Sequence, residues 1–283
     1  MIKLIVDKIK SLFFFLKPRK VVAQYKLFFK EDWFECSVDA IAPYVYKILL
    51  VVSDVAWGDD PHHHKIKRDD ISDLLEKIKL KYPGKVIVFQ GSWNQQISHV
   101  QAGLDYIKQN IPEATHCLYV DGDEIYSPSL IKALKKLIIH PKYFQKAIRI
   151  SYNTYFKTIY YKIDPIKYPT SLVMFPITDW ITYLDARNVN ASVVDIPHLC
   201  FEHPAYVRQT DEQMRLKIEA HRETEPIMGD WYHEVWLRWT PEIRNFHPTH
   251  PEFWERVVPV NPEQLPRCMV ETFEKWKNKH HEN

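Results

Sequence analysis

Glycine is scarce in this sequence, with six residues among 283. The chain contains neither a GxGxxG motif nor a GxxxxGKS/T motif. The glycine-rich turn of dinucleotide-binding proteins and the P-loop are therefore both excluded. If the chain binds a nucleotide, it must hold the phosphates in another way.

Cysteine and net charge exclude further classes. The four cysteines, Cys36, Cys117, Cys200 and Cys268, are too far apart to form CxxC zinc or redox sites, and reduced thiols in a cytosolic protein are the simplest interpretation. The formal net charge is +2, so we expect no nucleic-acid partner. No apolar run approaches the ~18 residues that a membrane-spanning helix needs.

Residues 1–20 differ in kind from the rest of the chain. Their apolar residues recur at helical spacing, and they carry six basic residues against one acidic residue, Asp7. The pattern predicts an amphipathic basic helix. Such a helix can lie on an anionic membrane surface or pack against the domain, and the sequence leaves both interpretations open.

Strand-like and helix-like segments alternate from residue 21 to residue 140. Strands are expected over 21–29, 47–52, 85–90 and 116–120, each followed by a helical apolar stripe. Ser127 and Pro128 are typical of a helix start, and Thr210 with Gln213 predicts a capping box that opens a later helix. Four βα units in succession predict a mainly parallel α/β sheet covered by helices. Aromatic, β-rich segments after residue 141 predict a mixed α+β second half.

Two carboxylates, Asp121 and Asp123, directly follow the fourth predicted strand. Ligands collect at the carboxyl ends of parallel strands, and alternate positions of an extended segment project to the same side. Carboxylate oxygens suit Mg²⁺ or Mn²⁺ that also binds phosphate oxygens. The pair therefore predicts a metal site, and a solvated acidic loop is the alternative.

Residues 119–124, Tyr-Val-Asp-Gly-Asp-Glu, resemble the DxD-E segment of glycosyltransferases with the GT-A fold, especially family 2 transferases of bacterial surface glycans. The resemblance continues with Phe-Lys-Glu at 29–31, with Trp93 at the start of the third helix, and with His-Pro-Ala-Tyr at 203–206 followed by Lys217. It covers roughly residues 21–220. It implies a GT-A, nucleotide-diphospho-sugar transferase fold.

The resemblance also implies an organisation of the chain. In this organisation the chain comprises the N-terminal helix over 1–20, a nucleotide-binding βα half over 21–140, an acceptor-side half over 141–260 and a C-terminal tail over 261–283. On the nucleotide side, Glu31 and Asp54 are expected to flank the base and ribose of a nucleoside-diphosphate sugar, with a UDP-sugar favoured. Trp93 is expected to line the same pocket.

The metal and the diphosphate are assigned by the same resemblance. Asp121 is expected to contact the ribose or the metal, and Asp123 to hold the metal on the diphosphate. His203 is then a further metal or phosphate ligand, and Arg208 or Lys217 neutralises the leaving diphosphate.

The acceptor hydroxyl needs a general base, for which Asp179 and Glu202 are the candidates. Strand alternation places Glu202 on the side opposite His203, which favours Asp179. The family's Arg-Asn pair in the third helix is replaced by Val100-Gln101, and no base motif of the family is present.

The sequence thus predicts a metal-dependent glycosyltransferase, inverting by resemblance, that moves a sugar to a glycan or lipid-linked acceptor. We expect it to act in the cytoplasm, peripherally on the inner membrane face. One alternative is a non-catalytic, membrane-associated assembly factor with the same fold. A nucleotidyltransferase is less favoured because it usually has a glycine-rich loop after the first strand, which this chain lacks.

Overall fold

The computed structural model describes residues 18–28, 31–58, 70–165, 170–221 and 227–281. The predicted helix over 1–20 therefore lies almost entirely outside the described residues, as does the Phe-Lys part of the 29–31 motif. Among the residues that are described, none of the helices is long and apolar enough to cross a membrane.

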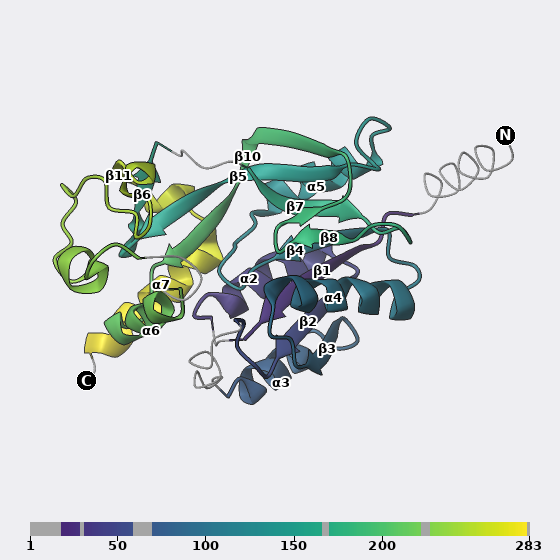
Figure 1. Ribbon diagram of the computed structural model, residues 1–283, viewed down its shortest axis with the longest axis horizontal. Coiled ribbons are helices and arrows are strands. Elements are labelled where there is room, and N and C mark those ends of the chain that lie inside the picture. The colour runs from purple at the N-terminus through teal and green to yellow at the C-terminus, as the bar shows by residue number, and fades with distance from the viewer. Residues whose placement is uncertain (1–17, 29–30, 59–69, 166–169, 222–226, 282–283) are drawn as a thin grey trace, which may run out of the picture.

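A mixed sheet forms the centre of the molecule, in the order β11-β6-β5-β7-β4-β1-β2-β3 with β10 beside β5 (Figure 1). Its parallel half consists of β1 (Val21–Leu27), β2 (Lys47–Ser53), β3 (Val86–Gly91) and β4 (His116–Val120). The other half consists of β5 (Ala147–Phe156), β6 (Thr158–Asp164), β7 (Ser171–Pro176), β10 (Val193–Tyr206) and β11 (Arg256–Pro259). In it, β7 is antiparallel to both β4 and β5, whereas β10 is parallel to β5. The predicted mainly parallel α/β sheet with a mixed second half is confirmed.

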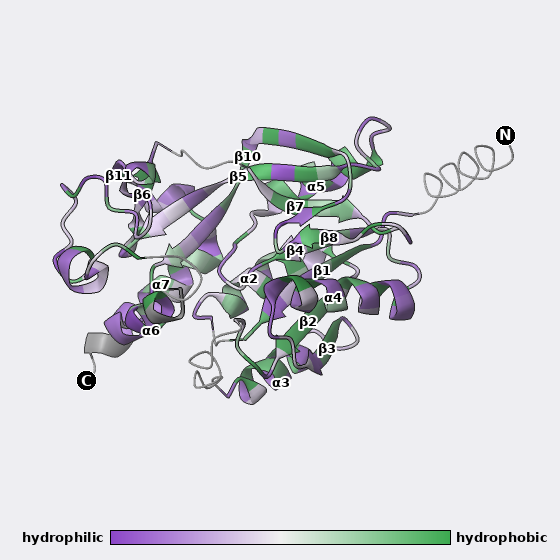
Figure 2. Ribbon diagram, viewed as in Figure 1, coloured by the Kyte–Doolittle hydropathy of each residue, from purple (hydrophilic) through white to green (hydrophobic). Residues whose placement is uncertain are grey.

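Helices cover both faces of the parallel half. They are α2 (Phe34–Ile41), α3 (Ser72–Lys81), α4 (Gln96–Asn110) and α5 (Pro128–Ile139). Alternate residues of β1 point to opposite faces, so Ala23 joins a core cluster with α2, α3 and α5, whereas Val22 joins a second one with α4. Figure 2 shows the strands between these helices as mainly hydrophobic, as expected for strands covered on both faces.

Two predicted helix starts are confirmed by their capping bonds. The Ser127 hydroxyl accepts from the Leu130 amide at 3.2 Å at the start of α5. Thr210 precedes α6 (Asp211–His221), and its hydroxyl accepts from the Gln213 amide at 3.2 Å. The Gln213 side chain in turn accepts from the Thr210 amide at 2.9 Å, which completes the capping box.

At the end of the sheet that carries β6 and β11, β5 and β10 extend into a lobe (Figure 1). The core of this lobe consists mainly of aromatic side chains. Phe156, at the end of β5, packs against Trp231, Trp236 and Trp254 with ring centroids 5.4–6.0 Å apart. A five-residue π-helix, Tyr232–Trp236, contributes Trp236 to the same cluster. Short 3-10 turns at Ala42–Tyr44, Pro251–Phe253 and Pro262–Gln264 connect other elements.

The C-terminal segment over 261–283 includes a helix, α7 (Arg267–His281), which packs against α2. Its Trp276 ring lies 4.5 Å from the ring of Trp33, at the start of α2. The last helix therefore belongs to the same packed unit as the sheet.

His116 starts β4 and is completely buried, with its Nε2 3.0 Å from the Phe144 carbonyl oxygen. Burial lowers its pKa to about 3. In the unfolded chain the pKa of a histidine is ~6.5. Between the folded and unfolded pKa values, the unfolded state therefore binds more protons than the folded state. The free energy of unfolding should therefore rise with pH across this window, by roughly 3 kcal/mol between pH 4 and pH 7.

The measurement is urea unfolding at a series of pH values, with His116→Gln as the comparison. The variant should show a shallower slope of unfolding free energy against pH. Equal slopes in the two proteins would contradict the assignment of a neutral, buried His116.

Candidate functional site

The site lies where β1, β2 and β4 end. Lys26 on β1, Val51 on β2 and Asp121 just after β4 stand at about the same level, because β1 pairs in parallel with both neighbours. The loop after β4 passes close to Glu31, and a Cβ on Gly122 would stand 2.9 Å from the Cβ of Glu31. Glycine at position 122 thus allows the acidic loop and Glu31 to approach closely.

A short bridge fixes the acidic loop to β10. The amide of Ile125 donates to the Glu202 carbonyl at 2.8 Å, and the amide of Glu202 donates back at 3.0 Å. Residue 203 follows immediately, and its ring reaches the acidic loop: Nε2 of His203 lies 3.6 Å from Oδ1 of Asp123.

Asp123 is buried and surrounded by cationic groups. Lys217 on α6 lies 3.2 Å from its Oδ2, and Nη2 of Arg208 lies 3.1 Å from the same oxygen. Burial alone would raise the pKa of Asp123, but Lys217, His203 and Arg208 hold that pKa well below its ordinary value. The carboxylate is therefore ionised at neutral pH.

Arg208 connects Asp123 to Glu31. Its Nη1 forms an ion pair with the Glu31 carboxylate, and its Nε donates to the Ala205 carbonyl at 3.1 Å. The guanidinium is only 5% exposed. The structure thus brings Glu31, Asp123, His203, Arg208 and Lys217 together.

Asp121 and Glu124 form a second group around Arg187. One guanidinium nitrogen of Arg187 pairs with Asp121, and the other lies 3.0 Å from Oε1 of Glu124. Lys26 stands 3.5 Å from Oδ1 of Asp121. Although burial opposes ionisation, Arg187 and Lys26 lower the pKa of Asp121, whereas burial outweighs Arg187 and raises the pKa of Glu124.

Arg187 is the residue that sequence reasoning missed. It occupies the turn between β8 (Tyr183–Asp185) and β9 (Asn188–Val189), a two-stranded hairpin apart from the main sheet. Its backbone amide donates to the Asp185 side chain at 2.7 Å, which fixes the turn. No motif or periodicity marks this position, because the contact with Asp121 depends on where the hairpin lies in space.

Charge is balanced across these contacts. The carboxylates at 31, 121, 123 and 124 face the cationic side chains at 26, 187, 208 and 217. Buried carboxylates at this density need such partners. The cations are also placed to contact an anionic group that enters the site.

The metal ligands predicted by the sequence do not form a complete cage. Among the residues that the structure describes, no group of three or more His, Cys, Asp or Glu side chains could hold an ion. Asp121, Asp123 and His203 lie close together, but the two carboxylates are directed at cationic partners. One oxygen, Oδ1 of Asp121, is buried with no hydrogen-bond partner. Two carboxylates still suit Mg²⁺ or Mn²⁺ when substrate phosphates supply other ligands.

The predicted nucleotide-side residues lie at the ends of β2 and β3. Asp54 is exposed and accepts from the Ser92 hydroxyl at 2.6 Å. Trp93 precedes α4 rather than opening it, and its ring stacks on His99 at 4.9 Å. Burial lowers the pKa of His99 to about 4, so this ring is neutral. Trp93 thus has a packing role, whatever else it contacts.

Neither predicted general base lies with the carboxylates at 121 and 123. Asp179 follows β7, which runs antiparallel to β4, so it lies at the opposite end of the sheet, where Pro176 pairs with His116. Glu202 points to the other side of β10 from His203, where the Tyr155 hydroxyl donates to it at 2.6 Å. Glu202 thus lies on the side of β10 expected from strand alternation, and the antiparallel direction of β7 carries Asp179, the favoured general-base candidate, away from the acidic loop.

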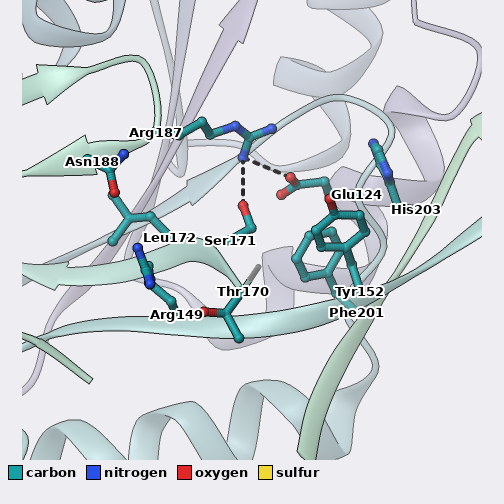
Figure 3. Close-up of a pocket in the computed structure, with 10 residues that line it drawn as sticks. All are labelled: Glu124, Arg149, Tyr152, Thr170, Ser171, Leu172, Arg187, Asn188, Phe201 and His203. Atoms are coloured by element: carbon teal, nitrogen blue, oxygen red, sulfur yellow. Dashed lines mark hydrogen bonds and ion pairs between the residues drawn. The ribbon is translucent and has the colours of Figure 1, made fainter. Parts of the chain in front are cut away.

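A cavity of about 290 Å³ opens beside the carboxylates (Figure 3). Glu124, Arg187 and His203 reach it from the groups described above, and Arg149, Tyr152 and Phe201 come from β5 and β10. It lies toward β5 and β7, away from the β1, β2 and β3 ends.

No protein-family model and no curated protein sequence matches this chain. Among solved structures, a fragment of S. aureus TarS comprising residues 1–349 is similar, with 11% identity, a TM-score of 0.43 and coverage of 72% of this chain and 65% of that fragment. The chain spans 39% of a longer TarS structure. A 4-diphosphocytidyl-2C-methyl-D-erythritol synthase from Anaerococcus prevotii is similar at 15% identity, with a TM-score of 0.38 and coverage of 70% and 94%. These similarities concern only the path of the backbone.

Removing the Arg187 guanidinium should destabilise the protein, because it leaves Lys26 as the cation paired with Asp121 and removes the ion pair of the buried Glu124. We expect Arg187→Ala to lower the free energy of unfolding by about 3 kcal/mol. Arg256→Ala, which removes an exposed pair with Asp164, should cost less than about 1 kcal/mol.

Urea unfolding at neutral pH measures both changes. Adding Glu124→Gln to Arg187→Ala should restore part of the stability, because it removes one of the two carboxylates. Equal small losses for Arg187→Ala and Arg256→Ala would show that the Arg187 pairs do not stabilise the fold.

Proposed function

We propose that this protein transfers a sugar from a nucleoside-diphosphate sugar to an acceptor hydroxyl. The observation that carries the proposal is the juxtaposition, at the carboxyl ends of parallel strands, of the carboxylates at 121 and 123 with the cations at 187, 208 and 217. Ligands of open α/β sheets bind at this edge. The nucleotide would lie over the ends of β1, β2 and β4, where Glu31 and Asp54 would flank its base and ribose.

A divalent cation, Mn²⁺ or Mg²⁺, would be held by Asp121 and Asp123 together with oxygens of the diphosphate. When bound, it supplies charge stabilisation to the departing diphosphate. The proposal is supported by the ionised state of both carboxylates and by Oδ1 of Asp121, which is buried without a hydrogen bond and has the Lys26 ammonium 3.5 Å away. His203 stands at Asp123 as a further phosphate or metal contact.

Arg208 and Lys217 would bind the diphosphate as the bond to the sugar breaks. Both side chains contact the same oxygen of Asp123, and neither residue belongs to the acidic loop. Cations held in place before the reaction stabilise developing negative charge without reorganising. Arg208 keeps its orientation through its bonds to Glu31 and Ala205.

A non-catalytic protein with this fold, acting in membrane-associated assembly, is the second candidate. One observation favours it: neither Asp179 nor Glu202 lies with the carboxylates at 121 and 123. The two candidates differ in nucleotide binding and turnover. Nucleotide release from a panel of sugar donors, measured as UDP from UDP-sugars, GDP from GDP-sugars and CMP from CMP-sugars, separates them, because a non-catalytic protein releases none.

Asp123→Asn should remove Mn²⁺-dependent UDP binding and reduce turnover of the nucleotide sugar by about 100-fold. The substitution keeps the size of the side chain and removes its charge. Calorimetric titration with UDP, with and without Mn²⁺, measures the binding. Asp73→Asn, at an exposed position on α3, is the matched control and should behave as wild type. Unchanged Mn²⁺-dependent affinity in Asp123→Asn would refute the metal assignment.

The basic amphipathic pattern of residues 1–20 supports a peripheral contact with anionic membranes as part of this proposal. Deletion of residues 1–17 should weaken sedimentation with vesicles that contain anionic lipid, and should leave UDP binding intact. Vesicles of neutral lipid are the control. Sedimentation that does not depend on these residues would remove the membrane role and leave the transferase proposal standing.

A further inference from the structure

The cavity beside the carboxylates adjoins the proposed reaction centre on the side away from the nucleotide. Ser171, the first residue of β7, lines it. Because β7 is antiparallel to β4, its first residue lies at the edge where β4 ends and the acidic loop begins. Arg187 belongs both to the acidic-loop site and to the cavity, since it pairs with Asp121 and also lines the cavity.

Arg149 has unused hydrogen-bonding capacity in this cavity. In the described part of the chain, its Nε donates to Asp195 at 2.9 Å, and its two terminal nitrogens make no hydrogen bond. Asp195 is 50% exposed, so this pair is a surface ion pair of small energy. The fork of terminal N–H groups is therefore available to a ligand. Figure 3 shows the Arg149 side chain reaching into the cavity from the side opposite Tyr152 and Phe201.

The guanidinium groups of Arg149 and Arg187 provide the unengaged hydrogen-bond donors of this cavity. The one carboxylate in the lining, Glu124, is already engaged by Arg187 and by the Tyr126 hydroxyl at 3.1 Å. Arg187 still has its Nε, which makes no hydrogen bond within the described residues. A lining rich in donors complements a ligand rich in acceptors, and guanidinium forks match carboxylate and phosphate oxygens.

An aromatic wall closes the opposite side. The rings of Tyr152 and Phe201 are stacked with centroids 5.4 Å apart, and His203 meets Tyr152 edge-on at 5.4 Å. Such a wall offers an apolar face for the carbon skeleton of a ligand. The volume of about 290 Å³ is sufficient for one sugar-sized group.

We propose that this cavity binds the acceptor through a carboxylate or phosphate group that the acceptor carries, with Arg149 as the specificity-determining residue. The role as an acceptor site rests on the proposed function, whereas the binding of an acidic sugar does not. In this arrangement the acidic group lies between Arg149 and Arg187, and the sugar ring lies against Tyr152.

The test is calorimetric titration of the full chain with three probes: glucuronate, glucose 6-phosphate and glucose. At least one acidic sugar should bind about tenfold or more tightly than glucose, because charge-assisted hydrogen bonds are the stronger ones. The two acidic probes distinguish a carboxylate from a phosphate. Arg149→Gln should weaken the preferred acidic sugar about tenfold or more, Arg149→Lys should weaken it less, and Arg256→Gln, at an exposed ion pair on β11, should leave it unchanged.

Glucose binding as tightly as both acidic sugars would overturn the proposal, as would saturable binding of none of the three. Equal affinities of the wild type and Arg149→Gln for the acidic sugar would also overturn it. Titration with UDP and Mn²⁺ on the same samples keeps the two proposals apart. If the protein binds the acidic sugar but does not bind UDP, the proposed transferase function is refuted and the proposed acidic-sugar site stands.

Discussion

Pairing of buried carboxylates with cations from distant segments is the constraint on which this site depends. The acidic loop after β4 places Asp121, Asp123 and Glu124 in a poorly hydrated position, where an unpaired charge costs several kcal/mol. Partners come from β1, from the β8–β9 hairpin, and from the segment that leads from β10 into α6. The charges of the loop therefore determine how these separate parts meet.

Much of the fold could be predicted from the sequence because its signals are local. The strand over 116–120 and the helix start at Ser127 lie as predicted, since apolar runs and capping residues act over a few positions. The position of Asp121 and Asp123 at a sheet edge follows from the same signals. His203, Arg208 and Lys217 were placed by a resemblance in the order of motifs, and the bridge between Ile125 and Glu202 is the contact that brings them to the loop.

The remaining features depend on directions and distances that a local pattern does not carry. Asp179 follows β7, which is antiparallel to β4 and therefore delivers the residue to the far edge. Arg187 lies in a hairpin of five strand residues whose sequence is ordinary. Its importance arises only from where the turn lies relative to Asp121. Antiparallel strand order and small irregular elements are thus the parts that sequence patterns leave undetermined.

The length of β10 has a mechanical consequence. This strand of 14 residues pairs with β5 and carries His203 near one end, while the two strands enter the aromatic lobe around Phe156. Tyr206, the last residue of β10, packs against Trp254 with ring centroids 4.5 Å apart, so the position of Arg208, two residues later in the chain, depends on the tryptophan packing of the lobe. A substitution in this aromatic core would therefore shift side chains that contact Asp123 without altering one of them.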